Sequence, residues 1–201
     1  MSGAGQVPFV GLTGGVGSGK STALAALAEL GAATLSADAV VHELLGSDEV
    51  RDAIVSRLGG DVLAADGSVD RSAVAARVFE RVEDRAWLEG VLWPRVGARI
   101  VEWRAEVDGL ERLPRAAVVE VPLLFESGMD SVFDTTIAVV ADEPLRAERA
   151  NARGHTAVAE RVGRQLTQHE KADRANHVVR NDGTREELKA ELSHVLATIE
   201  D

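Results

Sequence analysis

The chain has no cysteine and no tyrosine, and its aromatic residues make up only 3% of the sequence. The lack of cysteine excludes disulfide bonds, thiolate catalysis and cysteine-ligated zinc. The scarcity of aromatic rings leaves few surfaces on which the bases of single-stranded nucleic acid can stack. No apolar run approaches the ~18 residues of a membrane span, and the N-terminus lacks a basic segment followed by an apolar stretch. We therefore expect a cytoplasmic protein that binds neither membranes nor nucleic acid.

Basic residues are also in the minority, since 22 Lys and Arg stand against 33 Asp and Glu, for a net charge of -11. Such a chain repels polyphosphate backbones unless its basic residues are concentrated locally, and no Lys/Arg block of nucleic-acid type is present. The 201 residues, 45% of them hydrophobic, suffice for one compact domain with a sizeable core. No obligate protein partner is evident.

Apolar strand patterns alternate with helical patterns along the chain. A parallel sheet wound on both faces by helices is the architecture that this alternation predicts. The long helical stretch from about Asp48 to Asp108, interrupted at Asp66-Gly67, has no strand of its own and reads as an insertion. We expect a core of about 7–46, 110–142 and 177–201, with the insertion at about 47–109. The expected strands are 9–12, 32–36, 118–121, 136–140 and 177–179.

A glycine-rich segment, Gly14–Ser21, lies between the first expected strand and the first expected helix and matches the pattern G-x-x-x-x-G-K-[ST]. Its glycines let the backbone curl and point successive N–H groups at phosphate oxygens, at a helix N-terminus that also favours anions. Lys20 supplies a cation to the β and γ phosphates, and Ser21 a hydroxyl to Mg²⁺. The segment predicts a P-loop that binds ATP with Mg²⁺. The expected ATP contacts are Gly15, Val16, Gly17, Ser18, Gly19, Lys20, Ser21 and Thr22.

Three further polar residues follow expected strands or helix starts. Asp38 comes after the second strand, where a carboxylate can accept the proton of an attacking hydroxyl. It can equally serve as the N-cap of a helix that starts at Ala39, and the two roles are compatible. His42 follows one helical turn later, and a solvated surface histidine is its alternative role. Glu120 ends a strand where P-loop proteins keep an acid near Mg²⁺, and an ordinary strand-end carboxylate is the alternative.

Arginines recur on one helical face. Arg146, Arg149 and Arg153 are spaced by three and four residues, and Arg161 follows after a glycine break. In an acidic chain this arrangement favours a lid, at about 143–176, that closes over ATP and directs arginines at the transferred phosphoryl group. The alternative is a charged surface face on which the arginines pair with neighbouring glutamates.

Taken together, these segments resemble dephospho-coenzyme A kinase over about residues 8 to 198. The phosphate loop alone would fit many nucleotide-binding families, whereas the run Val-Pro-Leu-Leu-Phe-Glu combined with the Asp38 segment is far more specific. The residues that carry the resemblance are Gly11–Thr22, Ala37-Asp38-x3-His42, Asp66–Arg71, Val121–Glu126, Arg149-x3-Arg153, Arg161-x3-Gln165, Lys171 and Asn181-x-Gly183.

The resemblance implies transfer of the ATP γ-phosphate to the ribose 3′-hydroxyl of dephospho-coenzyme A, the last step of coenzyme A synthesis. It implies an α/β P-loop fold with a doubly wound parallel sheet, a helical substrate-domain insertion and an arginine-bearing lid. It makes Asp38 the catalytic base, assisted by Lys20, Arg149 and Arg153, with Glu120 holding Mg²⁺ through water. Asn181 and Gly183 would lie beside ATP. The implied acceptor contacts are Asp38, His42, Pro122, Leu123, Leu124, Phe125, Glu126 and Arg161.

Three positions depart from the pattern of that family. Ser36 stands where the family usually has the first acid of Asp-Ala-Asp, and Glu120 stands where it usually has Asp. Trp93-Pro94 stands where the family commonly has His-Pro. None of these changes touches Lys20, Ser21 or Asp38, so we retain the expected activity. Three rival readings remain: another small-molecule P-loop kinase, an ATP-hydrolysing regulatory protein, and a module that binds nucleotide without catalysis.

Overall fold

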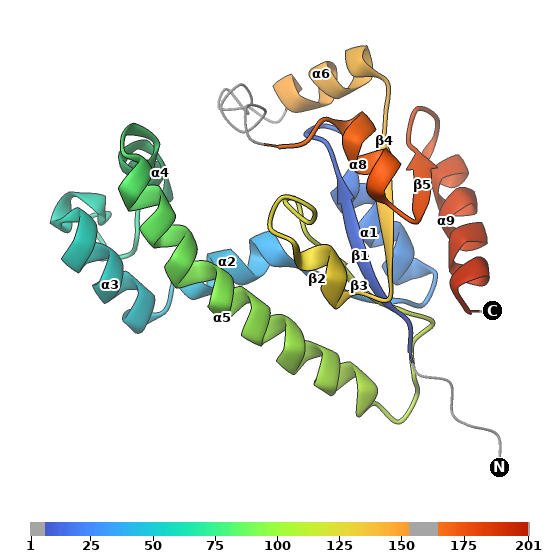
Figure 1. Cartoon of the computed structure of the whole chain (residues 1–201), viewed down its shortest axis with the longest axis horizontal. Helices are drawn as coiled ribbons and strands as arrows, with labels where there is room; N and C mark the ends of the chain where they lie inside the picture. Colours follow the sequence, from blue (N-terminus) through green and yellow to red (C-terminus); the bar gives the residue numbers. More distant parts are fainter. Residues whose placement is uncertain (1–6, 153–164, 201) are drawn as a thin grey trace. The chain divides into compact units, whose positions relative to one another are not determined.

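The computed structural model describes residues 7–152 and 165–200, and the chain divides into two compact units. The sheet unit contains the chain up to Ser36 and from Arg104 onward, and the helical unit is Ala37–Trp103. Figure 1 shows the strands and the helices α1 and α9 of the sheet unit, and the helices α2 to α4 of the helical unit. Among the described residues, no helix is long and apolar enough to cross a membrane.

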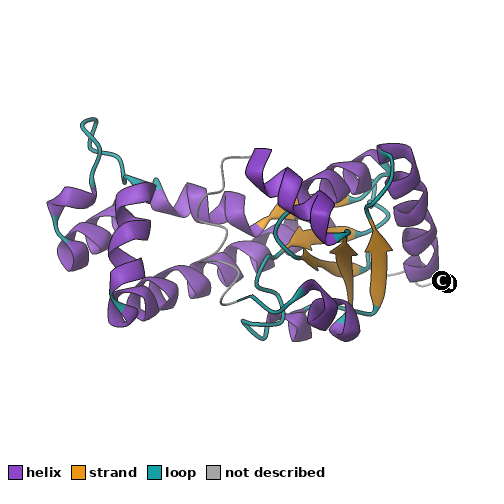
Figure 2. Cartoon of the chain, turned by 90° about the horizontal axis from the view of Figure 1, so that it is seen from above, coloured by secondary structure: helices purple, strands orange, loops and turns teal. Residues whose placement is uncertain are grey.

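The sheet unit is built on five parallel strands in the order β2-β3-β1-β4-β5. Most of their residues are apolar and buried, as expected for a parallel sheet covered on both faces. The expected parallel sheet is confirmed, and each strand lies within a residue or two of its expected place. Figure 2 shows the strands side by side with helices around them. The strands are β1 (Phe9–Gly14), β2 (Ala33–Ser36), β3 (Ala117–Glu120), β4 (Thr135–Val140) and β5 (His177–Arg180).

One face of the sheet packs against α1 (Lys20–Glu29) and α9 (Arg185–Glu200). Because side chains alternate between the faces of a strand, Val10 and Leu12 of β1 both point to this side. Leu188, Leu192 and Leu196 recur every four residues on α9, so one helical stripe is fully buried here. The members of this core include Val10, Leu12, Ala23, Ala26, Leu27, Val118, Ile137, Val139, Val179, Leu188, Leu192 and Leu196.

The other face of the sheet is covered by α8 (Gln168–Arg174) and by the turn that follows β3. Gly11 of β1 has no room for a side chain here, because a Cβ atom would lie 2.9 Å from the Phe133 ring and 3.0 Å from a methyl carbon of Leu124. The turn after β3 leads through the 3-10 helix η2 (Met129–Val132) into β4, and α6 (Glu143–Ala152) follows β4. The turn after β3 is therefore packed directly on β1.

The helix α1 stops where the sequence predicted, at Gly31. The backbone of Gly31 has a φ of +96°, which favours glycine. Its N–H donates to the carbonyl of Ala28 at 3.0 Å, and the N–H of Ala32 donates to the carbonyl of Leu27 at 3.0 Å. These two bonds satisfy carbonyls that the helix end leaves open, and they turn the chain directly into β2.

The helical unit has its own core, formed by α2 (Ala37–Leu45), α3 (Asp48–Leu58), η1 (Gly60–Val62), α4 (Arg71–Glu80) and part of α5 (Val82–Asp108). Side chains of α2, including Leu44 and Leu45, pack against this core, so α2 belongs to the helical unit. Ser47 and Asp70 accept backbone N–H bonds at the starts of α3 and α4. The core members are Val50, Ile54, Leu58, Val62, Val74 and Leu92.

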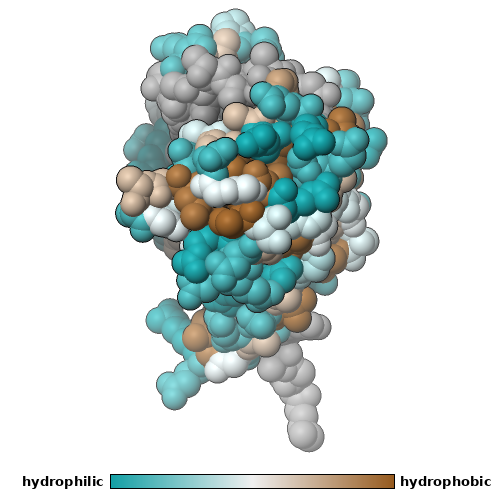
Figure 3. All heavy atoms as spheres, turned by 90° about the vertical axis from the view of Figure 1, so that its left-hand side faces the viewer, coloured by the Kyte–Doolittle hydropathy of each residue, from teal (hydrophilic) through white to brown (hydrophobic). Residues whose placement is uncertain are grey.

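A few large apolar side chains of the helical unit are exposed, namely Phe79, Val82, Trp93 and Val101. The molecular face in Figure 3 is largely hydrophilic, with a group of hydrophobic residues near its centre and others scattered toward its edges. Scattered exposed apolar side chains are normal for a protein surface.

The core between α9 and the sheet generates a stability prediction. Leu192 is fully buried, so we expect Leu192→Ala to lower the free energy of unfolding by about 2–5 kcal/mol through lost burial and a residual cavity. Urea denaturation measures this change. Leu110→Ala, at a half-exposed position, is the control and should change stability by less than about 0.5 kcal/mol. Equal losses in the two variants would contradict this account of the core.

Candidate phosphate-binding site

The turn between β1 and α1 has room for glycine alone at two positions. Gly17 and Gly19 have φ angles of +77° and +89°, which side-chain-bearing residues rarely adopt. A Cβ atom on Gly17 would lie 2.4 Å from the carbonyl oxygen of Arg146, and one on Gly19 would lie 2.0 Å from the Asn181 amide nitrogen. The backbone of the turn is therefore in close contact with α6 on one side and with the residue after β5 on the other.

Lys20 is the first residue of α1, and its side chain folds back over the turn. Its ammonium donates to the carbonyl oxygens of Gly14 at 3.0 Å and Gly15 at 3.1 Å. The positive charge thus lies over the same turn that the N-terminus of α1 faces. Two sources of positive potential, an ammonium and a helix N-terminus, converge on one short piece of backbone.

Two side chains from distant parts of the chain hold the turn from outside. Arg146 donates from Nε to the carbonyl of Val16 at 3.0 Å and pairs with Glu143 at 2.6 Å. Asn181, only 5% exposed, donates from its amide to the carbonyl of Ser18 at 2.8 Å. Arg149 in turn donates to the carbonyl of Asn181 at 2.9 Å. These contacts add to those of Lys20 and hold the turn from α6 and from the residue after β5.

Sequence reasoning found the arginines of α6 but missed what Arg146 contacts. Spacing placed it on one helical face with Arg149, and both the lid and the charged-face alternatives remained open. Arg146 combines features of both, because it pairs with Glu143 and also holds the backbone of Val16. Arg153 and Arg161, and with them the middle of the expected lid, lie outside the described residues.

A cavity of about 510 Å³ lies beside the turn between β1 and α1, residues 15–19, which we call the phosphate turn. Its walls are the turn, α6 and the segment that begins α8, and its size is in the range of small-molecule sites. The residues that line it include Gly15, Val16, Arg146, Asn151, Gln165 and Thr167.

Hydroxyl groups of the turn differ in exposure. The Oγ atom of Ser18 is buried and has no hydrogen-bond partner within the described part of the chain. Ser21, in the first turn of α1, is exposed. An exposed hydroxyl at the first turn of α1, together with the glycine cradle and Lys20, fits a phosphate group carrying Mg²⁺, an ion that takes few protein ligands. The described residues contain no group of three or more acidic or histidine side chains arranged as a metal site.

Glu120 lies at the carboxyl edge of the sheet. It is the last residue of β3, it is 6% exposed, and it stands in register with Leu12 of β1 and Ser36 of β2. Gly14, the last residue of β1, lies two residues beyond Leu12 and leads into the phosphate turn. The two features therefore occupy the same edge of the sheet, as expected for ligand sites of open α/β sheets.

A buried ion pair lies behind this edge. Lys171 of α8 is 0% exposed, and its ammonium contacts Glu126 at 2.9 Å and donates to the carbonyl of Pro122 at 2.5 Å. Burial lowers the pKa of Lys171 below its ordinary value, and the Glu126 carboxylate opposes that shift. The sequence pointed to Lys171 only as part of a family pattern, because nothing in its spacing reveals that the side chain is buried.

The helical unit carries the other expected acceptor residues. Asp38 is exposed and lies in the first turn of α2, which starts at Ala37, so the structure does not support its role as the residue before the helix. His42 lines a cavity of about 800 Å³ within this unit, together with Arg71. Arg71 follows the cap Asp70 in the Asp66–Arg71 segment, and its place in this cavity was missed at the level of sequence.

A parallel sheet of order 2-3-1-4-5, with a glycine-rich turn and a lysine between the central strand and the next helix, defines a P-loop nucleotide-binding protein. The sequence matches the family model described as dephospho-CoA kinase over residues 8–187. This protein therefore belongs to the dephospho-CoA kinase family.

Individual relatives are similar to this chain over nearly its whole length. A protein named dephospho-CoA kinase from Protochlamydia amoebophila is 39% identical over 188 residues, which cover 91% of this chain and 92% of the relative. A crystal structure of a Thermus thermophilus protein has a TM-score of 0.79 and 32% identity, covering 96% of this chain and 98% of that one. A dephospho-CoA kinase from Campylobacter jejuni has a TM-score of 0.69 and 25% identity, with 95% and 96% coverage.

The support of the turn by Asn181 can be tested. In Asn181→Asp the carboxylate cannot donate to the Ser18 carbonyl, and it brings a negative charge to the site of the phosphates. We expect the dissociation constant for ATP, measured by titration calorimetry, to rise at least about tenfold. The control is Asn176→Asp, because the side-chain oxygen of Asn176 accepts bonds from the N–H and the hydroxyl of Thr136, which a carboxylate can also do. Parental ATP affinity in the Asn181 variant would contradict the assignment.

Proposed function

We propose that this protein transfers the γ-phosphate of ATP to the ribose 3′-hydroxyl of 3′-dephospho-coenzyme A, giving coenzyme A and ADP. The observation that carries the proposal is the match to the dephospho-CoA kinase family over nearly the whole chain. The glycine turn with its lysine supports the nucleotide half of the reaction.

At the nucleotide, the turn from Gly15 to Thr22 binds the ATP phosphates through backbone N–H groups. Lys20 stabilises the charge that develops on the transferred phosphoryl group, since its ammonium is already directed at the turn. Ser21 and, through water, Glu120 would hold Mg²⁺, which neutralises phosphate charge when bound. Asn181 and Gly183 contact ATP from the loop after β5, and Arg149 supports Asn181 there by donating to its carbonyl.

At the acceptor, Asp38 takes the proton of the ribose 3′-hydroxyl as that oxygen attacks the γ-phosphorus. Its support is its position two residues beyond β2 and its exposed carboxylate. His42 and the segment Pro122–Glu126 bind the rest of the acceptor. The arginines between β4 and α8, a segment that acts as a lid, approach the phosphoryl group; they include Arg149, Arg153 and Arg161.

The decisive experiment is a coupled assay of ADP release with and without dephospho-coenzyme A. We expect release to depend on the acceptor and to be abolished in Lys20→Ala, while the thermal midpoint stays near that of the parent because Lys20 is not a core residue. ADP release that needs no acceptor favours an ATP-hydrolysing regulator. Release with a different small hydroxyl compound favours another P-loop kinase. Nucleotide binding without turnover favours a binding module.

The role of Asp38 has its own test. Asp38→Asn keeps the size of the side chain but cannot take up a proton, so we expect kcat and kcat/KM to fall by ~10²-fold or more with ATP affinity nearly unchanged. Steady-state kinetics and ATP titration measure both quantities. Ser36 stands where the family usually has another acid, so that position offers no base to replace Asp38. A fully active Asp38→Asn enzyme would refute the assignment.

A further inference from the structure

Lys171 is fully buried, although lysine is rarely buried in proteins. Removing an ammonium from water is costly, and a methionine of similar length would fill the same space without that cost. A buried ion pair is thus weak evidence for a contribution to stability. Stability therefore does not explain why a lysine occupies this buried position.

The helix that carries Lys171 is anchored at its start. Thr167 and Glu170 form reciprocal hydrogen bonds that cap α8. The amide group of Gln168 accepts from the N–H of Ala141 at 3.1 Å and donates to the carbonyl of Ala141 at 2.8 Å, which ties the first turn of α8 to the end of β4. A side chain on so firmly held a helix can place its charge with little freedom.

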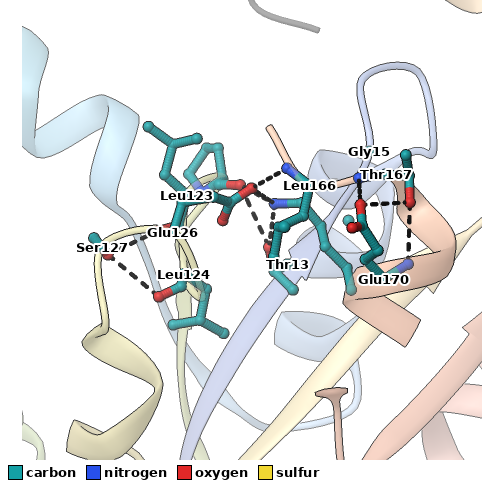
Figure 4. A network of polar contacts seen from close by, with 12 residues as sticks. Thr13, Gly15, Leu123, Leu124, Glu126, Ser127, Leu166, Thr167 and Glu170 are labelled. Carbon is teal, nitrogen blue, oxygen red and sulfur yellow. Dashed lines mark hydrogen bonds and ion pairs between the residues drawn. The ribbon is translucent and has the colours of Figure 1, made fainter. Parts of the chain in front are cut away.

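The ammonium of Lys171 joins two segments of the candidate site. It contacts Glu126 and the carbonyl of Pro122 in the turn after β3, and it lies 3.4 Å from the hydroxyl of Thr13, the residue before Gly14. Glu126 also accepts from the N–H of Leu166 at 2.8 Å, at the entry to α8. Figure 4 shows Glu126, Thr13 and Leu166 side by side in this network.

The contacts with Lys171 and Leu166 hold the Glu126 carboxylate in one orientation. One of its oxygens accepts from both Lys171 and Leu166. The other is buried and has no partner within residues 7–152 and 165–200. The contacts of the first oxygen fix the plane of the carboxyl group, so the second oxygen is an acceptor held in one direction.

We propose that Lys171 is a positioning residue for the acceptor: its ammonium holds the turn after β3, through Pro122 and Glu126, against the end of β1 that leads into the phosphate turn. The inference rests on the proposed function, because the Pro122–Glu126 segment binds the acceptor only under that proposal. Lys171 does not contact substrate itself. It sets the direction of groups that do.

The test is Lys171→Met, which keeps the length of the side chain and removes the charge. We expect the KM for dephospho-coenzyme A to rise about tenfold or more, with the KM for ATP changed less than about threefold. The amides of Ser127, which bonds within the turn, and of Leu166, which bonds to Glu126, should exchange with solvent at least about tenfold faster. If the methionine variant does not fold, Lys171→Gln, which keeps a polar donor, replaces it.

Two controls separate positioning from general weakening. Lys189→Met removes a lysine that pairs with Glu29 at 2.8 Å on the surface of the sheet unit, and it should leave both KM values unchanged. Leu192→Ala destabilises the core on the opposite face of the sheet, and it should lower the thermal midpoint without a selective change in the acceptor KM. An equal rise in the KM for dephospho-coenzyme A in Leu192→Ala would show that lost stability, rather than lost positioning by Lys171, causes the rise.

A parental acceptor KM and unchanged exchange at Ser127 and Leu166 in the Lys171 variant overturn the inference. Failure of the proposed function looks different, because the parent then releases no ADP in response to dephospho-coenzyme A. In that case the exchange rates of the two amides still decide whether Lys171 holds the turn.

Discussion

The close approach of the α6 backbone and of the Asn181 side chain to the phosphate turn is the constraint on which the candidate site depends. Gly17 touches the backbone of α6 and Gly19 touches Asn181, so neither position can carry a side chain. Besides Lys20, which bonds to the carbonyls of Gly14 and Gly15, side chains from distant parts of the chain hold the turn. Arg146 and Asn181 provide that support by donating to carbonyls of the turn. Because both side chains bond to carbonyls, they do not occupy the N–H groups of the turn, which can bind phosphate oxygens.

Several basic side chains gather at the edge of the sheet that carries the phosphate turn. The chain as a whole carries a net charge of -11, yet Lys20, Arg146 and Arg149 all bond to the turn or to the residue that supports it. An anionic ligand therefore meets locally positive potential on a protein that repels polyanions elsewhere. Lys171 adds a further cation behind the edge, and its partner Glu126 keeps it from adding net charge there.

Membership of the dephospho-CoA kinase family is consistent with how the two units are built. The sheet unit carries the phosphate turn at the end of a buried strand, and the helical unit, which carries Asp38 and His42 on α2, has a separate core. A site carried on strands and helices is held more precisely than one made of loops alone. The Pro122–Glu126 segment gains comparable rigidity from Lys171 and from the packing of Leu124 on Gly11.

The sequence by itself determined the parallel sheet, the phosphate turn and the end of α1, because each depends on local patterns: apolar strand runs, the glycine spacing of Gly14–Ser21, and Gly31 after an amphipathic helix. It also pointed to Lys171 and Asn181, but only as members of a pattern. The tertiary structure alone decided that Asn181 supports Ser18, that Arg146 holds Val16, and that Lys171 is buried against Glu126. These contacts join residues 45 to 163 positions apart, and the packing of whole helices on the sheet, rather than any local preference, brings such residues together.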